Sequence, residues 1–73
     1  MSNEQITFLK IKTGLKLNIK YIVSVHYYED SDQVDTLEFR MSDGSKEYSK
    51  NEDNDCFNDA LYFYRNGRIN PDS

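Results

Sequence analysis

Cysteine, proline, glycine and tryptophan are scarce in this chain. Its 73 residues include one cysteine, one proline, three glycines and no tryptophan. A single cysteine, Cys56, cannot form an internal disulfide, which excludes a disulfide-stapled secreted scaffold and favours a reducing compartment such as the cytoplasm. With one cysteine and one histidine, His26, a zinc site is not expected either.

Long apolar runs are absent as well. No segment approaches the roughly 20 apolar residues of a membrane-spanning helix, and residues 1–5 lack the apolar core of a secretion signal. The hydrophobic content of 37% is nevertheless enough to fold a chain of this length. We therefore expect one cytoplasmic domain over residues 1–73, with flexible tails at 1–4 and 70–73 and no membrane partner.

The net charge of −4 is unevenly distributed along the chain. Most of the acids lie after residue 28, whereas the first 28 residues contain one acid and four lysines: Lys10, Lys12, Lys16 and Lys20. Overall acidity argues against general affinity for nucleic acids or anionic membranes. The lysine-rich start leaves a local exception open.

Alternation of apolar and charged residues predicts a β-hairpin over residues 6–18. Leu9 and Ile11 alternate with lysines, which is typical of a strand with one buried face. Thr13 and Gly14 then provide a tight turn, because glycine adopts the positive φ that such turns need. The lysines at 10, 12 and 16 are expected on the outer face of this hairpin.

Three further strands are predicted in the middle of the chain. The alternation changes phase at Ile19–Tyr21, where we expect a bend or bulge. A strand over 22–29 would then place Val23, Val25 and Tyr27 on one face and His26 and Tyr28 on the other. Strands over 35–41 and 46–48 form a second hairpin, since Ser-Asp-Gly-Ser between them is a strong turn signal.

A helix is predicted over residues 52–66. Four apolar residues follow the i, i+3, i+4, i+7 pattern of one helix face: Phe57, Ala60, Leu61 and Tyr64. Ser49 and Glu52 have the spacing of a capping box at its start, and Gly67 is expected to end it.

These elements predict an α+β fold in the order β-β-β-β-β-α, a curled antiparallel sheet of about five short strands followed by one C-terminal helix. An open sheet covered by the helix and a small SH3-like barrel both fit the pattern. The expected core is Leu9, Ile11, Leu15, Leu17, Val23, Val25, Leu37, Phe39, Phe57, Ala60, Leu61 and Tyr64.

Residues for catalysis or for metal binding do not form a recognisable pattern. Cys56 has no candidate base nearby in sequence, and its place beside the apolar helix stripe favours a structural role. Residues 51–55 alternate oxygen-bearing side chains as a calcium loop does, but Cys56 and Tyr62 stand where that loop needs glycine and glutamate. The sequence therefore predicts no enzyme, no metal and no cofactor.

The predicted helix also carries residues that its apolar face does not use. Tyr62 falls among Asp55 and Asp59, and Phe63 lies on the flank. Since interface cores are rich in aromatic residues, the sequence predicts a contact surface here for a basic protein partner, with His26 and Tyr28 as a second patch. An inhibitor or immunity-type protein, directed at a basic nucleic-acid enzyme or toxin, would act in this way.

An alternative function is left open by the lysine-bearing start of the chain. A small regulator could bind nucleic acid through the hairpin with Lys10, Lys12, Lys16 and Lys20, since the tyrosines could stack on unpaired bases. Homo-oligomerisation through an exposed strand edge is a further interpretation that the sequence allows.

Overall fold

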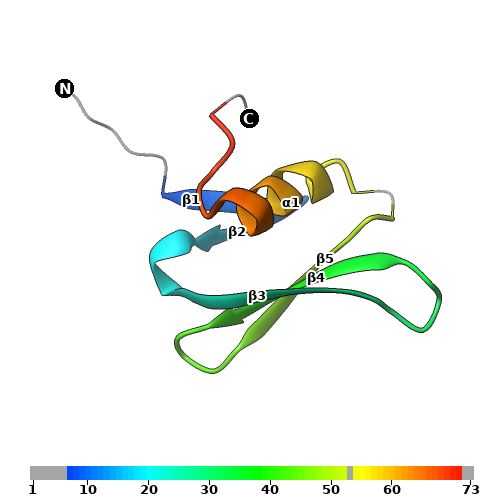
Figure 1. The fold of residues 1–73 in the computed structure, drawn as a ribbon. Helices are drawn as coiled ribbons and strands as arrows, with labels where there is room; N and C mark the ends of the chain where they lie inside the picture. The colour runs from blue at the N-terminus through cyan, green and yellow to red at the C-terminus, as the bar shows by residue number, and fades with distance from the viewer. Residues whose placement is uncertain (1–6, 53, 72–73) are drawn as a thin grey trace.

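The computed structural model describes residues 7–52 and 54–71. Five antiparallel strands in two sheets are followed by one C-terminal helix (Figure 1), which confirms the predicted α+β order. The two sheets are not closed into a barrel, so the SH3-like alternative is not adopted. Of the tails predicted at 1–4 and 70–73, only Asn70 and Pro71 fall within the described residues.

The first sheet is the predicted hairpin. β1 (Phe8–Lys12) pairs with β2 (Leu15–Asn18), and the turn between them contains Gly14 at a φ of 82°. Residues alternate between buried and exposed along β1, so Leu9 and Ile11 enter the core while the lysines remain outside. The alternation in the sequence therefore assigned both faces of β1 correctly.

A short 3-10 helix, η1 (Ile19–Tyr21), turns the chain from the first sheet into the second at the predicted bend. The Asn18 side chain accepts a hydrogen bond from the Lys20 backbone N–H at 2.9 Å and so caps this turn. The Tyr21 carbonyl accepts a second bond, 2.8 Å long, from the Ser42 N–H. The bend is thus tied to the second sheet at the end where the chain enters it.

The second sheet has the strand order β3-β4-β5, formed by β3 (Ile22–Glu29), β4 (Asp35–Met41) and β5 (Lys46–Lys50). The prediction that Val23 faces the core is wrong. The register shifts between Ile22 and Ser24, so Ile22 packs against the core and Val23 is 67% exposed. A bulge inserts one extra residue into a strand and changes which side chains point inward.

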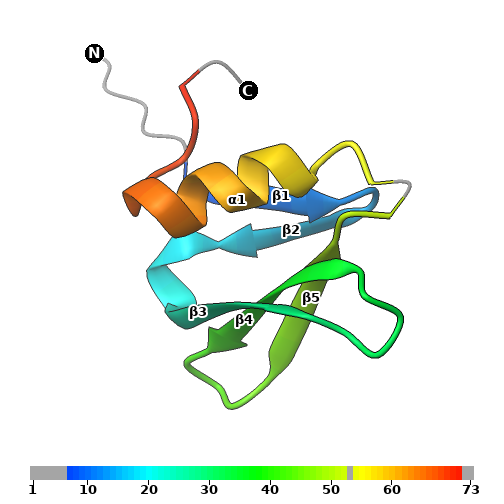
Figure 2. The ribbon, with the colours of Figure 1, turned by 45° about the vertical axis from the view of Figure 1, so that its right-hand side comes forward.

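The core lies between the two sheets and the helix α1 (Phe57–Asn66). The helix runs alongside the β1–β2 hairpin, and the three-stranded sheet lies below both in the view of Figure 2. The buried hydrophobic side chains of the core come from all three layers: Leu9, Ile11, Leu17, Leu37, Phe39, Phe57 and Ala60. Leu15, Val25 and Leu61, also expected in the core, pack against this cluster partly buried.

The helix begins five residues later than predicted, at Phe57 instead of Glu52. Ser49 belongs to β5 and is fully buried, where its hydroxyl donates to the Ile11 carbonyl at 2.7 Å, so the predicted capping box does not form. Asn54 occupies the connection and accepts a hydrogen bond from the Cys56 N–H at 3.0 Å. Asp53, included in the predicted helix, lies outside the described residues.

The end of α1 agrees with the sequence, but its buried face is rotated. Gly67 adopts a φ of 73° and its N–H bonds to the Phe63 carbonyl at 2.8 Å. Tyr64, expected in the core, is exposed and meets Tyr27 edge-on with ring centroids 5.7 Å apart. Phe63 packs against the core instead, 6.5 Å from the ring of Phe39. Within the described residues, no helix has the length and apolarity required to cross a membrane.

Candidate basic surface

The side of α1 predicted to bind a partner exposes only some of the residues expected there. Asp55 is exposed, and Asp59 and Tyr62 are half-buried. Phe63 was expected at the exposed flank, but this expectation is wrong because the ring fills space beside Phe39 in the core. Two carboxylates and one partly covered tyrosine remain on this side of α1.

The outer face of the β1–β2 hairpin is a lysine face, formed by Lys10, Lys12 and Lys16, all exposed. Lys10 is paired directly with Lys16 across the two strands. Like charges placed opposite each other in a sheet are destabilising. None of these lysines forms an ion pair within residues 7–52 and 54–71, so no carboxylate there relieves the repulsion.

Lys20 and Phe8 are close in sequence to the residues of the lysine face. Lys20 is exposed on η1, after the end of β2, as the sequence predicted. Phe8 shares the alternation of Lys10 and Lys12 along β1 and is 54% exposed. The hairpin therefore presents an exposed aromatic ring beside unpaired positive charges.

The outer face of the three-stranded sheet gathers tyrosines and basic residues. Leu37 and Phe39 point into the core, so Thr36, Glu38 and Arg40 of β4 lie on the opposite face. The strand register places Tyr28 and Lys50 on either side of Thr36, and His26 and Tyr48 on either side of Glu38. Tyr28 and Tyr48 are 41% and 39% exposed, and both flank the central strand.

The local environment on this outer face favours the neutral form of Tyr28 and the ionised form of Glu38. Desolvation, followed by the negative charge of Glu38, raises the pKa of Tyr28 above its ordinary value. A hydrogen bond from Arg40 lowers the pKa of Glu38, and the Arg40 Nε lies 2.6 Å from the Glu38 Oε2. The Tyr28 phenol therefore stays protonated at neutral pH, which suits ring stacking and hydrogen-bond donation.

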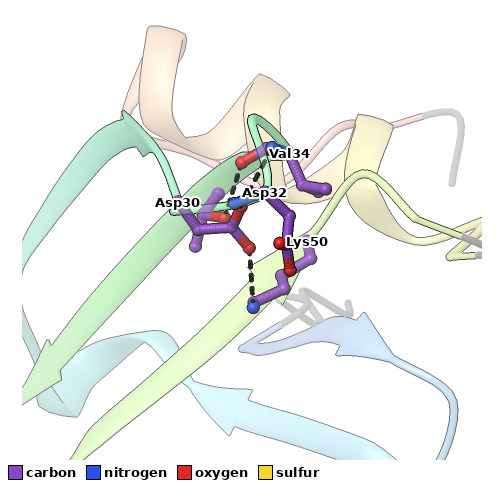
Figure 3. Close-up of polar contacts among 5 residues, drawn as sticks. Asp30, Asp32, Val34 and Lys50 are labelled. Atoms are coloured by element: carbon purple, nitrogen blue, oxygen red, sulfur yellow. Dashed lines mark hydrogen bonds and ion pairs between the residues drawn. The ribbon is translucent and has the colours of Figure 1, made fainter.

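Lys50 is held in place at one end of this face (Figure 3). Its Nζ lies 2.8 Å from the Asp30 Oδ2, and this contact lowers the pKa of Asp30 and raises that of Lys50. The other Asp30 oxygen accepts the Asp32 and Val34 N–H groups at 2.8 and 3.0 Å, which fixes the β3–β4 turn. The lysine is consequently positioned without being buried.

A hollow of about 360 Å³ connects the two faces. Lys12 and Thr13 border it from the hairpin tip, and Tyr48, Lys50, Glu52 and Asn54 border it from β5 and the segment that follows. Asn54 fixes this junction, since its Nδ2 donates to the Ile11 carbonyl at 3.0 Å and to the Ser49 Oγ at 3.1 Å. We call the combined area the basic surface: Lys10, Lys12, Lys16, Lys50, Tyr28 and Tyr48.

The sequence indicated the hairpin lysines as an alternative nucleic-acid site and Tyr28 only as part of a patch for a protein partner, and neither Tyr48 nor Lys50 was predicted as part of a site. Lys46–Tyr48 was recognised only as a short closing strand, whereas β5 extends to Lys50. The alternation of Lys46, Tyr48 and Lys50 was a signal for a shared outer face. Their position beside Tyr28 depends on the pairing of both strands with β4, which the sequence does not specify.

Among the described residues, few other side chains are arranged for metal binding or catalysis. No group of three or more histidine, cysteine, aspartate or glutamate side chains is arranged there to hold a metal ion. Cys56 is half-buried just before α1, and the His26 Nε2 lies 3.2 Å from the Ser24 hydroxyl. Searches of protein-family models, of curated proteins and of solved structures found no match to this chain.

Proposed function

We propose that this protein is a small, non-catalytic, cytoplasmic binding module that holds single-stranded nucleic acid on its basic surface. The observation that carries the proposal is the pairing of Lys10 with Lys16, with Lys12 beside them and no carboxylate partner in the described residues. This arrangement costs stability in the free protein. A phosphate backbone would offset the repulsion.

Exposed tyrosines favour a single strand over a duplex. Tyr28 and Tyr48 lie on the outer sheet face beside Lys50, and unpaired bases stack on such rings with little sequence preference. In a duplex the faces of the bases are already stacked on each other. The hollow between Lys12 and Tyr48 would let one strand of nucleic acid contact the lysine face and the outer sheet face without a break.

The net charge of −4 does not conflict with this proposal, because the hairpin lysines lie apart in the chain from most of the acids, and Asp30 and Glu38 at the outer sheet face are paired with Lys50 and Arg40. Leu9 and Ile11 pack inward toward the side where α1 runs, so Lys10 and Lys12 project to the opposite side of the hairpin from Asp59. The overall negative charge weakens association at a distance, whereas the local lysines attract a strand that has reached the surface.

A protein partner at the helix side is the second candidate. Asp55, Asp59 and Tyr62 remain at least partly exposed there, and their charge suits the basic partner of an inhibitor or immunity-type protein. Burial of Phe63 leaves this side with one aromatic anchor, which is why we rank it second.

A titration of fluorescein-labelled oligothymidylate of about 15 nucleotides tests the first proposal. At about 50 mM salt we expect the Lys10→Gln/Lys16→Gln protein to bind about tenfold more weakly than the unchanged protein. The matched control is Arg65→Gln/Arg68→Gln, which removes the same charge from exposed positions at the end of α1 and beyond. Anisotropy measures the affinity of each protein.

Two outcomes would contradict nucleic-acid binding at this surface. One is an absence of binding by the unchanged protein at low salt. The other is an equal loss in both double variants, which would indicate a response to net charge alone. A Tyr62→Ala protein should bind the oligonucleotide normally, and a loss there would instead implicate the helix side.

A further inference from the structure

A second hollow, lined by acidic instead of basic side chains, lies away from the hairpin tip. It measures about 380 Å³ and is bounded by β2 and η1 on one side and by the β4–β5 hairpin on the other. Its lining shares no residue with the basic surface: Leu17, Tyr21, Met41, Ser42, Asp43, Ser45 and Glu47. We call it the acidic groove.

The acidic groove combines an apolar base with two carboxylates. Leu17 is buried and Met41 half-buried, while the Tyr21 ring is exposed along one wall. Glu47 lies on the same sheet face as the buried Phe39 with which it pairs, and it is itself half-buried. Neither Asp43 nor Glu47 forms an ion pair within the described part of the chain.

Both walls of the groove are fixed by hydrogen bonds in the free protein. The Ser42 N–H donates to the Tyr21 carbonyl at 2.8 Å, which joins η1 to the end of β4. The Ser45 N–H and hydroxyl both donate to the Asp43 Oδ1, at 2.9 and 2.6 Å, which orders the turn. A ligand would therefore meet a preformed site, which lowers the entropic cost of binding.

We propose that the acidic groove binds a peptide segment of a partner protein that carries arginine or lysine next to an apolar residue. The basic group would lie near Glu47 and Asp43, and the apolar neighbour would cover Leu17 and Met41. The Tyr21 ring would contact the cation through its face. A chain with both surfaces would link a nucleic acid to a basic protein, because the two sites use different residues.

Charge complementarity selects this occupant over others. A nucleic acid would be repelled by the two carboxylates, and an apolar segment without a cation would leave Glu47 without a partner on the ligand. Peptide binding in the acidic groove does not depend on nucleic-acid binding, since it involves only the residues that line the groove. Failure of one proposal therefore leaves the other standing.

The test uses the tripeptide acetyl-Leu-Arg-Phe-amide and its counterpart with glutamate in the central position. Titration of the whole protein followed by NMR should show the arginine peptide binding weakly, with a Kd on the order of millimolar. Resonances of Tyr21, Met41 and Glu47 should shift most. The glutamate peptide should bind at least about fivefold more weakly.

Variants locate the interaction within the groove. Glu47→Gln should weaken binding of the arginine peptide about fivefold, whereas Glu52→Gln, which removes a carboxylate outside the groove, should leave it unchanged. Tyr21→Ala provides a second test at an exposed ring, in case Glu47→Gln disturbs folding. Equal binding of both peptides, or shifts confined to other surfaces, would overturn the proposal.

Discussion

Replacing Phe39 by alanine is expected to lower the free energy of unfolding by about 3–5 kcal/mol. The ring is fully buried at the centre of β4, beside Phe63 and among the core side chains of both sheets. A domain of this size has a total stability of only about 4–10 kcal/mol. The variant should therefore be marginally folded, which urea denaturation followed by circular dichroism would measure.

Phe8→Ala is the matched control for that measurement. It removes the same ring from a site that is 54% exposed, so we expect a change within about 0.5 kcal/mol. Similar losses for Phe8→Ala and Phe39→Ala would mean that the core is not where the structure places it.

Asn54→Ala is expected to cost about 2 kcal/mol of unfolding free energy, which is large for one polar side chain. Its amide donates to the Ile11 carbonyl and the Ser49 hydroxyl and accepts from the Cys56 N–H. The residue thus joins β1, β5 and the start of α1. Without it the Cys56 N–H loses an acceptor, and the hollow next to Lys12 loses one wall.

The control for this prediction is Asn51→Ala, three residues earlier in the same connection. Asn51 is exposed, and no hydrogen bond of its side chain is present among the described residues. Its replacement should change the stability by less than about 0.5 kcal/mol. A result in which both asparagines behave alike would show that the Asn54 contacts contribute little in solution.

The parts of the fold that depend on local pattern could be predicted from the sequence. Alternation assigned the faces of β1, and glycine and turn residues located the hairpins and the end of α1. The lysine face followed directly from that alternation, since Lys10, Lys12 and Lys16 occupy the outward positions. These features arise from interactions between residues close together in the chain.

Features set by long-range contacts were missed. The bulge that exposes Val23 depends on how β3 meets β4, and Ser49 was interpreted as a helix cap because its bond to Ile11 spans 38 residues. The placement of Tyr28 and Tyr48 on either side of β4 depends on the register of three strands. The face of α1 was misjudged because Phe63, not Tyr64, meets Phe39.

The most direct test of the central claim is a map of the bound oligonucleotide on the protein. Backbone amide resonances of the unchanged protein would be followed by NMR during titration with the same oligothymidylate at low salt. We expect the largest shifts on β1, β2 and the outer residues of β3 and β5, including Lys10, Lys16, Tyr28 and Tyr48. Shifts centred on α1 or on the acidic groove, or no shifts at all, would contradict this claim.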